Sequence, residues 1–345
     1  MKNINLSKKK PLFIAEISAN HNGKIQNAKK LIKIAKENGA DFVKLQTYTP
    51  ECMTINSDEK NFQIKRGIWK GHSLWSLYKK AQTPLSWHKE LFQYSKRLGI
   101  KCFSSPFSES MVDFLESLNC PLYKLASFEL LHAPLIKRIA KTKKPIIIST
   151  GMANLKEVDF AVNTARKNGA KKIIILYCVS NYPAKISDFN LNNISILKKR
   201  YKCMVGFSDH SQDNRVAFAA VAAGAEIVEK HIALEKEKSS PDYKFSLKEN
   251  EIKKFKQDLI FSKTLLGKSI FYRNRSETNS LQFRRSIYSK KDIKKGEKFT
   301  KKNLQIIRPG FGLSPMFYDN LLKMKSTINI KKNKPLSKKL FKILK

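Results

Sequence analysis

The sequence has few cysteines and no motif that pairs them. Its five cysteines are odd in number and scattered through 345 residues: Cys52, Cys102, Cys120, Cys178 and Cys203. Because no CxxC pair occurs, neither a disulfide framework nor a cysteine zinc site is indicated. This pattern favours a protein of the reducing cytoplasm.

Long hydrophobic runs are also missing. No stretch of about 18 apolar residues occurs, so we expect no membrane span. Near the N-terminus, Glu16 interrupts the apolar run that begins at Leu12, which argues against a secretory signal. Hydrophobic residues nevertheless make up 41% of the chain. A chain of this length and apolar content can bury a large core, which excludes global disorder.

Arginine is scarce although the chain is strongly basic. The formal net charge is +40, but only 11 of the 68 basic residues are arginine. Proteins that read nucleic acids depend on arginine for bidentate contacts. We therefore interpret the lysines as a compositional bias of solvent-facing surfaces and expect no nucleic-acid partner. A basic nucleic-acid-binding protein stays the alternative from another functional class, and it predicts salt-sensitive retention of DNA or RNA.

Short apolar runs alternate with amphipathic stretches over most of the chain, and no GxGxxG follows the first run. The absence of that motif disfavours an open dinucleotide-binding sheet. The expected strands are residues 12–15, 42–46, 101–104, 122–126, 145–149, 173–178, 204–207 and 226–231. Eight buried strands, each followed by a helix, predict an α/β fold, a (β/α)8 TIM barrel, over residues 1–268.

Two further segments do not belong to this repeat. The stretch from Thr49 to Gln82 is too long for a simple connection and is interpreted as a lid or binding segment. Residues 269–282 are polar and are interpreted as a linker. The alternating pattern and the Pro-Gly-x-Gly-Leu turn of residues 283–345 predict a small β-rich domain.

Lysines occur inside two of the expected strands. Lys44 lies between Val43 and Leu45, and Lys124 lies in the fourth strand. A buried ammonium group must find an anion or bear the cost of desolvation. Small hydroxyl residues follow several of the same strands, at the barrel end where active sites lie. The sequence therefore predicts a site for a phosphate or phosphate ester.

Two histidines stand at matched positions of neighbouring strands. His210 and His231 are separated by one βα unit and both lie at strand ends. Two imidazoles placed in this way can share a divalent metal, and zinc is not favoured because no cysteine or third histidine is near. Glu16 is a candidate further ligand or general base.

Several runs taken together resemble the sialic acid synthase family. They are AEISANHNG, VKLQTY, FSSPFS, YKLASFE, ISTGM, GFSDHS and EKH, in this order. The C-terminal run RRSIYSKKDIKKGEKFTKKNLQIIRPGFGLSP is similar to that family's antifreeze-like (SAF) domain. IWKGHSLWSLYKKAQTPLSWH and PDYKFSLKENE look most like the pseudaminic acid branch, with the N-acetylneuraminate and legionaminate branches as alternatives.

The resemblance implies a reaction and its participants. The family joins phosphoenolpyruvate to an open-chain acetamido sugar and releases phosphate. For the pseudaminic branch the acceptor is a 2,4-diacetamido-2,4,6-trideoxy hexose and the product a nine-carbon nonulosonic acid. The family needs a divalent cation, Mn²⁺ or Mg²⁺, and works as a domain-swapped homodimer. A different phosphoenolpyruvate aldol enzyme is the enzymatic alternative, although it would lack the C-terminal module.

The resemblance also implies roles for individual residues. His210 and His231 match metal ligands, and Glu16 and Glu129 are the candidates for moving the proton. Phosphoenolpyruvate-binding positions are matched by Lys44, Ser105, Lys124, Ser127, Ser149, Ser180 and Ser208. Positions near the acceptor sugar are matched by Gln46, Tyr182, Asp242 and Arg308, the last of which would reach the acceptor from the other subunit.

Overall fold

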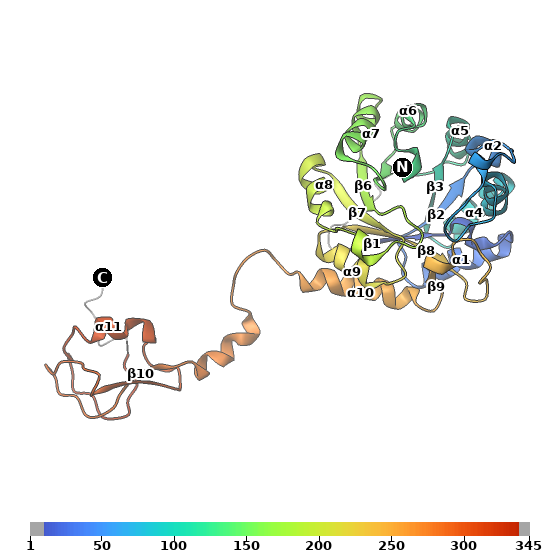
Figure 1. Ribbon diagram of the computed structural model, residues 1–345. Coiled ribbons are helices and arrows are strands. Elements are labelled where there is room, and N and C mark those ends of the chain that lie inside the picture. The colour runs from blue at the N-terminus through green and yellow to red at the C-terminus, as the bar shows by residue number, and fades with distance from the viewer. Residues whose placement is uncertain (1–9, 338–345) are drawn as a thin grey trace. The chain divides into compact units, whose positions relative to one another are not determined.

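The chain folds into two compact units, which meet in sequence between Gly267 and Lys268 (Figure 1). The structure, a computed structural model, describes residues 10–337. Residues 1–9 of the predicted barrel segment and residues 338–345 of the predicted C-terminal domain lie outside this range. Among the described residues no helix is both long and apolar enough to cross a membrane.

The first unit is a closed barrel of parallel strands, so the fold expected from the sequence is confirmed. Each strand pairs with the next, and the eighth pairs back to the first. The strands are β1 (Leu12–Glu16), β2 (Phe42–Thr47), β3 (Lys101–Pro106), β4 (Tyr123–Leu125), β5 (Ile146–Ser149), β6 (Ile173–Cys178), β7 (Met204–Asp209) and β8 (Ile227–Ala233). A short strand, β9 (Leu247–Lys248), extends the pairing at β8.

Helices surround the barrel, and at least one follows each strand (Figure 1). They are α1 (Ile25–Glu37), α4 (Leu85–Arg97), α5 (Glu109–Ser117), α6 (Ala133–Lys141), α7 (Leu155–Lys167), α8 (Asn193–Tyr201), α9 (Arg215–Ala222) and α10 (Ile252–Leu265). Their apolar faces pack on the outward side chains of the strands, as Leu31 and Ile32 of α1 do. Gly169 ends the turn after α7 with φ of 106°, a conformation that side chains disfavour.

The barrel interior consists of an apolar floor and a polar layer above it. Ile14, Phe42, Phe103, Leu122, Ile147 and Ile227 line one small internal void and form the floor. Two residues further along the same strands lie Glu16, Lys44, Ser105, Lys124, Ser149 and Glu229. Since alternate residues of a strand point to the same side, these six strands change from apolar to polar on their inner faces within one step. The lysines in apolar runs are explained by this change.

The segment Thr49–Gln82 is partly helical, with α2 (Pro50–Met53), the 3₁₀ turn η2 (Lys60–Phe62) and α3 (Leu74–Ala81). Its middle part is a small hairpin in which Gln63 bridges Ser73. Tyr78 of α3 packs edge-on against Tyr48, with ring centroids 5.9 Å apart. The segment is therefore attached to the end of β2 and is not a loose loop.

The second unit has its own small apolar core. Strand β10 (Ser286–Ser289) pairs antiparallel with β11 (Leu304–Ile307), which agrees with the β-rich domain expected there. Ile287, Phe299 and Leu304 are buried in that core. Between the barrel and this core, the 3₁₀ helix η6 (Arg275–Phe283) occupies most of the segment interpreted as a linker and has no buried residue.

Candidate active site

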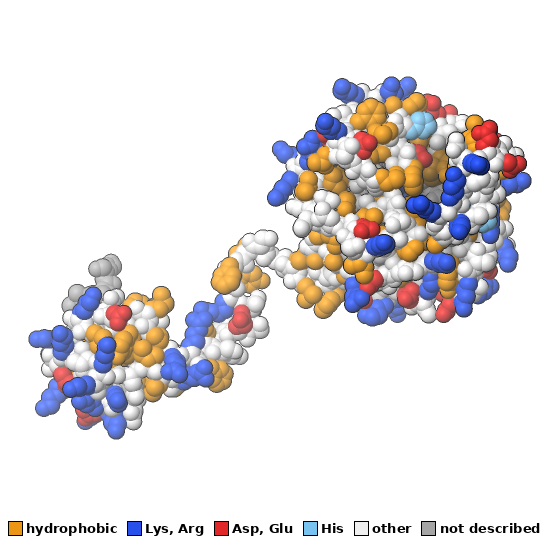
Figure 2. Space-filling model, viewed as in Figure 1, with side chains coloured by type: hydrophobic (Ala, Val, Ile, Leu, Met, Phe, Trp, Pro, Cys, Tyr) orange, Lys and Arg blue, Asp and Glu red, His pale blue; other side chains and the backbone are white. Residues whose placement is uncertain are grey.

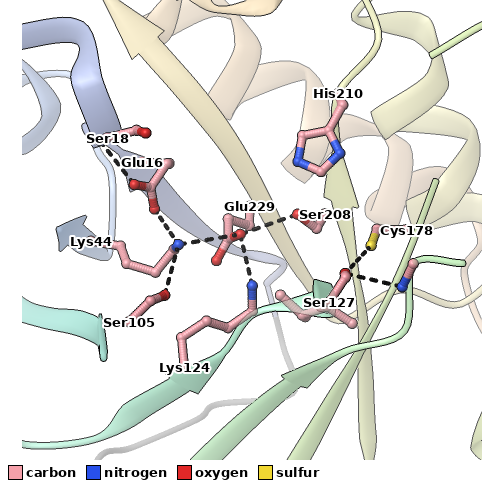
Figure 3. Close-up of polar contacts among 12 residues, drawn as sticks. Glu16, Ser18, Lys44, Ser105, Lys124, Ser127, Cys178, Ser208, His210 and Glu229 are labelled. Atoms are coloured by element: carbon pink, nitrogen blue, oxygen red, sulfur yellow. Dashed lines mark hydrogen bonds and ion pairs between the residues drawn. The ribbon is translucent and has the colours of Figure 1, made fainter. Parts of the chain in front are cut away.

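Lys44 and Lys124 are buried in the polar layer, and their partners are carboxylates of the same chain. Lys44 forms an ion pair with Glu16 and donates to Ser105 Oγ at 3.3 Å. Lys124 Nζ donates to Glu229 Oε1 at 3.1 Å, and Lys44 Nζ lies 3.7 Å from the same oxygen (Figure 3). The buried ammonium groups thus have anionic partners, as the sequence predicts. These partners are carboxylates of the protein itself.

Glu229 joins the two lysines, a role that no motif in the sequence predicted. Besides the lysines, Ser208 Oγ donates to Glu229 Oε1 at 3.1 Å. Burial opposes its charge, but Lys124 and Lys44 hold the pKa of Glu229 at about 2, so this carboxylate is ionised at neutral pH. Its position two residues before His231 on β8 places both on the inner face, which is the signal that could have revealed it.

Glu16 and Glu129 differ from Glu229 because burial dominates their ionisation. The backbone N–H of Ser18 donates to Glu16 Oε1 at 2.9 Å, yet burial raises the pKa of Glu16 in spite of Lys44 and His231. Burial raises the pKa of Glu129 to about 7. Glu129 Oε2 is buried and has no hydrogen-bond partner among residues 10–337. Glu129 is therefore able to carry a proton near neutral pH.

The hydroxyl residues gather around Gly151, at the ends of β4, β5 and β6. Ser127 Oγ accepts from the backbone N–H of Gly151 at 3.1 Å and contacts Cys178 Sγ at 3.1 Å (Figure 3). A Cβ atom on Gly151 would lie 1.9 Å from Ser180 Oγ, so only glycine permits this approach. Ser149 Oγ is buried and lacks a hydrogen-bond partner among the described residues, which suits a hydroxyl that awaits a ligand oxygen.

His210 and His231 lie beside each other at the mouth of the barrel, with ring centroids 5.8 Å apart. His210 Nδ1 donates to the carbonyl of Val179 at 3.1 Å, which leaves Nε2 with its lone pair. Burial, together with His231, lowers the pKa of His210 to about 3, so its imidazole is neutral. His231 Nδ1 lies 3.4 Å from Asp242 Oδ2 without the geometry of a hydrogen bond.

These neighbours fit a divalent cation. Neutral imidazoles are good metal ligands, and a carboxylate near a ligating histidine fixes its orientation. Within residues 10–337 no group of three or more His, Cys, Asp or Glu side chains has metal-binding geometry. The protein would accordingly supply the two imidazoles, and water or substrate oxygen atoms would complete the coordination.

Aromatic side chains form a wall beside the histidines. The Tyr182 ring lies 4.3 Å from His210, and Phe245 lies 4.9 Å from His231, both measured between centroids. Tyr182 and Asp242 are thus brought next to the histidines, while Gln46 is half-buried, two residues beyond Lys44 on β2. Arg308 is exposed and follows β11 in the second unit, so its predicted approach to an acceptor stays a prediction.

Comparison with known proteins gives the family. The NeuB family pattern matches residues 31–271, and the SAF domain pattern matches residues 284–342. The pseudaminic acid synthase of Helicobacter pylori is 43% identical over 95% of this chain and 96% of its own. The N,N'-diacetyllegionaminic acid synthase of Campylobacter jejuni is 40% identical over 94% of this chain and 98% of its own.

A solved structure supports the same assignment. The N-acetylneuraminic acid synthetase of Leptospira borgpetersenii, in complex with citrate, superimposes with a TM-score of 0.73 at 26% identity. The match covers 82% of this chain and 95% of that chain. The barrel and the C-terminal module agree with the resemblance that the motifs carried. The chain belongs to the NeuB family and carries a SAF domain after its catalytic barrel.

Proposed function

We propose that this chain is a phosphoenolpyruvate-dependent transferase with the activity of a pseudaminic acid synthase. It condenses phosphoenolpyruvate with an open-chain 2,4-diacetamido-2,4,6-trideoxy hexose and releases a nine-carbon nonulosonic acid and phosphate. The observation that carries the proposal is the layer of Lys44, Lys124 and hydroxyl groups directly below His210 and His231. The 43% identity to a pseudaminic acid synthase supports the choice of acceptor.

Phosphoenolpyruvate is the anion that we assign to the polar layer. Its phosphate and carboxylate need several short donors in a small space, which lysines and serines provide. The donors are Lys44, Ser105, Lys124, Ser127, Ser149, Ser180 and Ser208. Because the floor below is apolar and closed, the ligand enters from the mouth, where the histidines lie. Both reactants are then held in register, which lowers the entropic part of the barrier.

We assign the divalent metal, Mn²⁺ or Mg²⁺, to His210 and His231. When bound, it supplies a Lewis acid that polarises the aldehyde oxygen of the acceptor. The methylene carbon of phosphoenolpyruvate forms the new bond to the aldehyde carbon, and water adds to the enol carbon. The resulting tetrahedral carbon expels phosphate. Lys44 and Lys124 stabilise the anionic charge throughout.

Proton transfer is assigned to carboxyl groups whose pKa burial raises. Glu16 is the first candidate, because it lies on β1 beside Lys44 and pairs in register with His231 of β8. Glu129 is the second, with a pKa of about 7 that allows it to give or take a proton at neutral pH. Gln46, Tyr182 and Asp242 are assigned to the acceptor sugar, and the last two lie beside His210 and His231.

We further propose a domain-swapped homodimer in the cytoplasm. In this arrangement Arg308 of the SAF domain orients the acceptor in the other subunit's barrel through its guanidinium donors. The five cysteines form no disulfide in the described part of the chain, which is consistent with a reducing compartment. No nucleic-acid or membrane partner is proposed. On the visible face of the barrel, basic side chains are scattered among acidic and apolar ones and form no continuous stripe (Figure 2).

The decisive experiment is phosphate release from phosphoenolpyruvate with a panel of three acetamido sugars, with and without a chelator. The trideoxy diacetamido acceptor should give the highest kcat/KM, and the chelator should abolish turnover until Mn²⁺ or Mg²⁺ is restored. A preference for a legionaminate-type or mannosamine acceptor would favour the second candidate, which the 40% identity to a legionaminic acid synthase supports. Absence of release with every sugar would refute the proposed class of reaction.

A further inference from the structure

A hairpin in the Thr49–Gln82 segment presents one tryptophan at its tip. The hairpin spans residues 63–73 and is closed by the backbone hydrogen bonds Ile64 N–H to His72 O at 2.9 Å and Gly71 N–H to Ile64 O at 3.1 Å. Gly71 has φ of 93°, which lets the chain turn back tightly. Trp69 lies in the turn, so its position is fixed by the hairpin's own backbone.

Trp69 reaches elements far away in the sequence. Its indole Nε1–H donates to the carbonyl of Pro241 at 3.1 Å, and its ring lies 5.5 Å from the ring of Tyr182. Pro241 belongs to the loop after β8 and Tyr182 to the loop after β6. The hairpin from the β2 end of the barrel therefore extends to the β6 and β8 loops at the mouth.

Tyr182 links Trp69 to the histidines. The rings of Trp69, Tyr182 and His210 follow one another at centroid distances of 5.5 Å and 4.3 Å. Phe245 contacts Tyr182 at 5.3 Å and His231 at 4.9 Å, so it completes an aromatic wall. Tyr182 contacts both other rings, and no ring contact in the described chain joins Trp69 directly to His210.

The aromatic wall differs chemically from the polar layer to which phosphoenolpyruvate is assigned. An acceptor with its aldehyde at the histidines and its chain along the wall brings its far end to Trp69. An indole has one polar group, and here Pro241 already takes it. The remaining surface of Trp69 is apolar and offers no hydrogen bond to a hydroxyl group. A terminal methyl group packs well against such a face, whereas a terminal hydroxymethyl group loses its water without compensation.

We propose that Trp69 is a specificity-determining residue, which selects acceptors that end in a methyl group over acceptors that end in a hydroxymethyl group. This inference rests on the proposed function and deepens it, because it names the part of the acceptor that the chain reads. The Pro241 contact has a second role. Its carbonyl shares a peptide unit with the N–H of Asp242, the residue beside His231, so Trp69 also positions that carboxylate.

The test compares two acceptors that differ only at carbon 6, a trideoxy diacetamido hexose and its 6-hydroxy counterpart. The wild type should prefer the 6-deoxy sugar in kcat/KM. W69A should reduce that preference by about tenfold, the size expected for one buried group. W69F keeps an apolar face and loses only the hydrogen bond, so it should lower kcat/KM for both sugars and keep their ratio. W69Q offers an amide partner and should shift the ratio toward the 6-hydroxy sugar.

Controls separate this role from a structural one. Trp75 in α3 belongs to the same segment, and its side chain makes no hydrogen bond or ring contact with the rest of the described chain, so W75F should behave as the wild type. Calorimetric affinity for phosphoenolpyruvate should be equal in all variants, which also reports folding. Unchanged acceptor ratios in W69A and W69Q would overturn the inference while leaving the function intact. Failure of the wild type to use either sugar would overturn both.

Discussion

Glu229 Oε1 accepts a hydrogen bond from Lys124 Nζ at 3.1 Å, in a position that excludes solvent from both groups. Together with Glu16 and Lys44, they form a cluster of two carboxylates and two ammonium groups. The cluster satisfies the lysines before any substrate is present. An incoming phosphate compound must therefore compete with, or rearrange, the carboxylates that already hold the same two cations.

Removing the charge of Glu229 should have opposite effects on the free and the bound protein. E229Q leaves Lys124 and Lys44 with too little negative charge, so the ligand-free protein should lose on the order of 3 kcal/mol of stability. Phosphoenolpyruvate should then raise the stability of E229Q more than that of the wild type, because it replaces the missing charge. Urea unfolding with and without phosphoenolpyruvate measures both effects. Equal ligand-induced stabilisation in the two proteins would contradict the competition.

Ser149 should matter for binding and not for folding. Its hydroxyl is buried without a hydrogen-bond partner in the described chain, so S149A removes no internal hydrogen bond. The free energy of unfolding should therefore stay within about 0.5 kcal/mol of the wild type. A hydrogen bond to a charged phosphate oxygen is worth about 1.5–3 kcal/mol. The dissociation constant of phosphoenolpyruvate should accordingly rise by a factor of ten or more in calorimetry. Destabilised S149A with unchanged affinity would assign the hydroxyl a structural role instead.

Glu129 should make stability depend on pH. Burial raises its pKa to about 7 in the folded chain, from an ordinary value of 4.5. The folded state therefore binds more protons than the unfolded state between these values, and stability falls as pH rises from 4.5 to about 7. The total loss is at most about 3 kcal/mol. E129Q cannot titrate at this position. Its free energy of unfolding should therefore rise relative to that of the wild type as the pH increases across this range.

An E129Q difference that stays constant from acid to neutral pH would show that Glu129 is ionised throughout. The same pair of proteins tests the chemical role. If protonated Glu129 contributes to turnover, the wild-type rate should decline above about pH 7 and E129Q should lack this limb. The affinity for the acceptor, measured separately by calorimetry, distinguishes a lost proton carrier from a lost binding contact.

Arg308 and His210 lie in different units of the chain, and their variants should complement each other. R308A should mainly raise KM for the acceptor, while H210A should abolish metal-dependent turnover. In the proposed swapped dimer, a mixed pair contains one barrel with intact His210 that meets a SAF domain with intact Arg308. Mixed and re-associated subunits should recover up to about a quarter of the wild-type rate, the statistical share of such sites. Mixtures without any recovery would argue against the exchange.

Much of the barrel can be predicted from the sequence because strands buried in a closed parallel sheet have a simple and recognisable residue pattern. Each strand shows an apolar run with a polar residue at its end, and Lys44 and Lys124 stand out because they break the run. His210 and His231 could be paired since consecutive strands are neighbours in a barrel. What could not be predicted is which charge compensates which. Glu229 stands next to Lys230 in the sequence, yet Lys230 points outward to Asp209 while Glu229 points inward to Lys124.

The contact between Trp69 and Pro241 could not be predicted from the sequence for a different reason. The hairpin that carries Trp69 is closed by a few backbone hydrogen bonds, and its two glycines only mark turns. Nothing in the pattern says which loop across the mouth it meets. In the same way, the partly helical character of the segment after Lys268 was missed, because η6 has no buried face whose periodicity could reveal it.

The two-residue step from floor to polar layer separates the residues that stabilise the barrel from those assigned to the reaction. Ile14, Phe42, Phe103 and Ile147 line the apolar floor, while the groups assigned to the proposed chemistry lie just above them. Substitutions in the floor can therefore aim at higher thermostability without changing the residues of the pocket. Conversely, residues of the polar layer can be substituted to accept new sugars while the apolar floor stays unchanged.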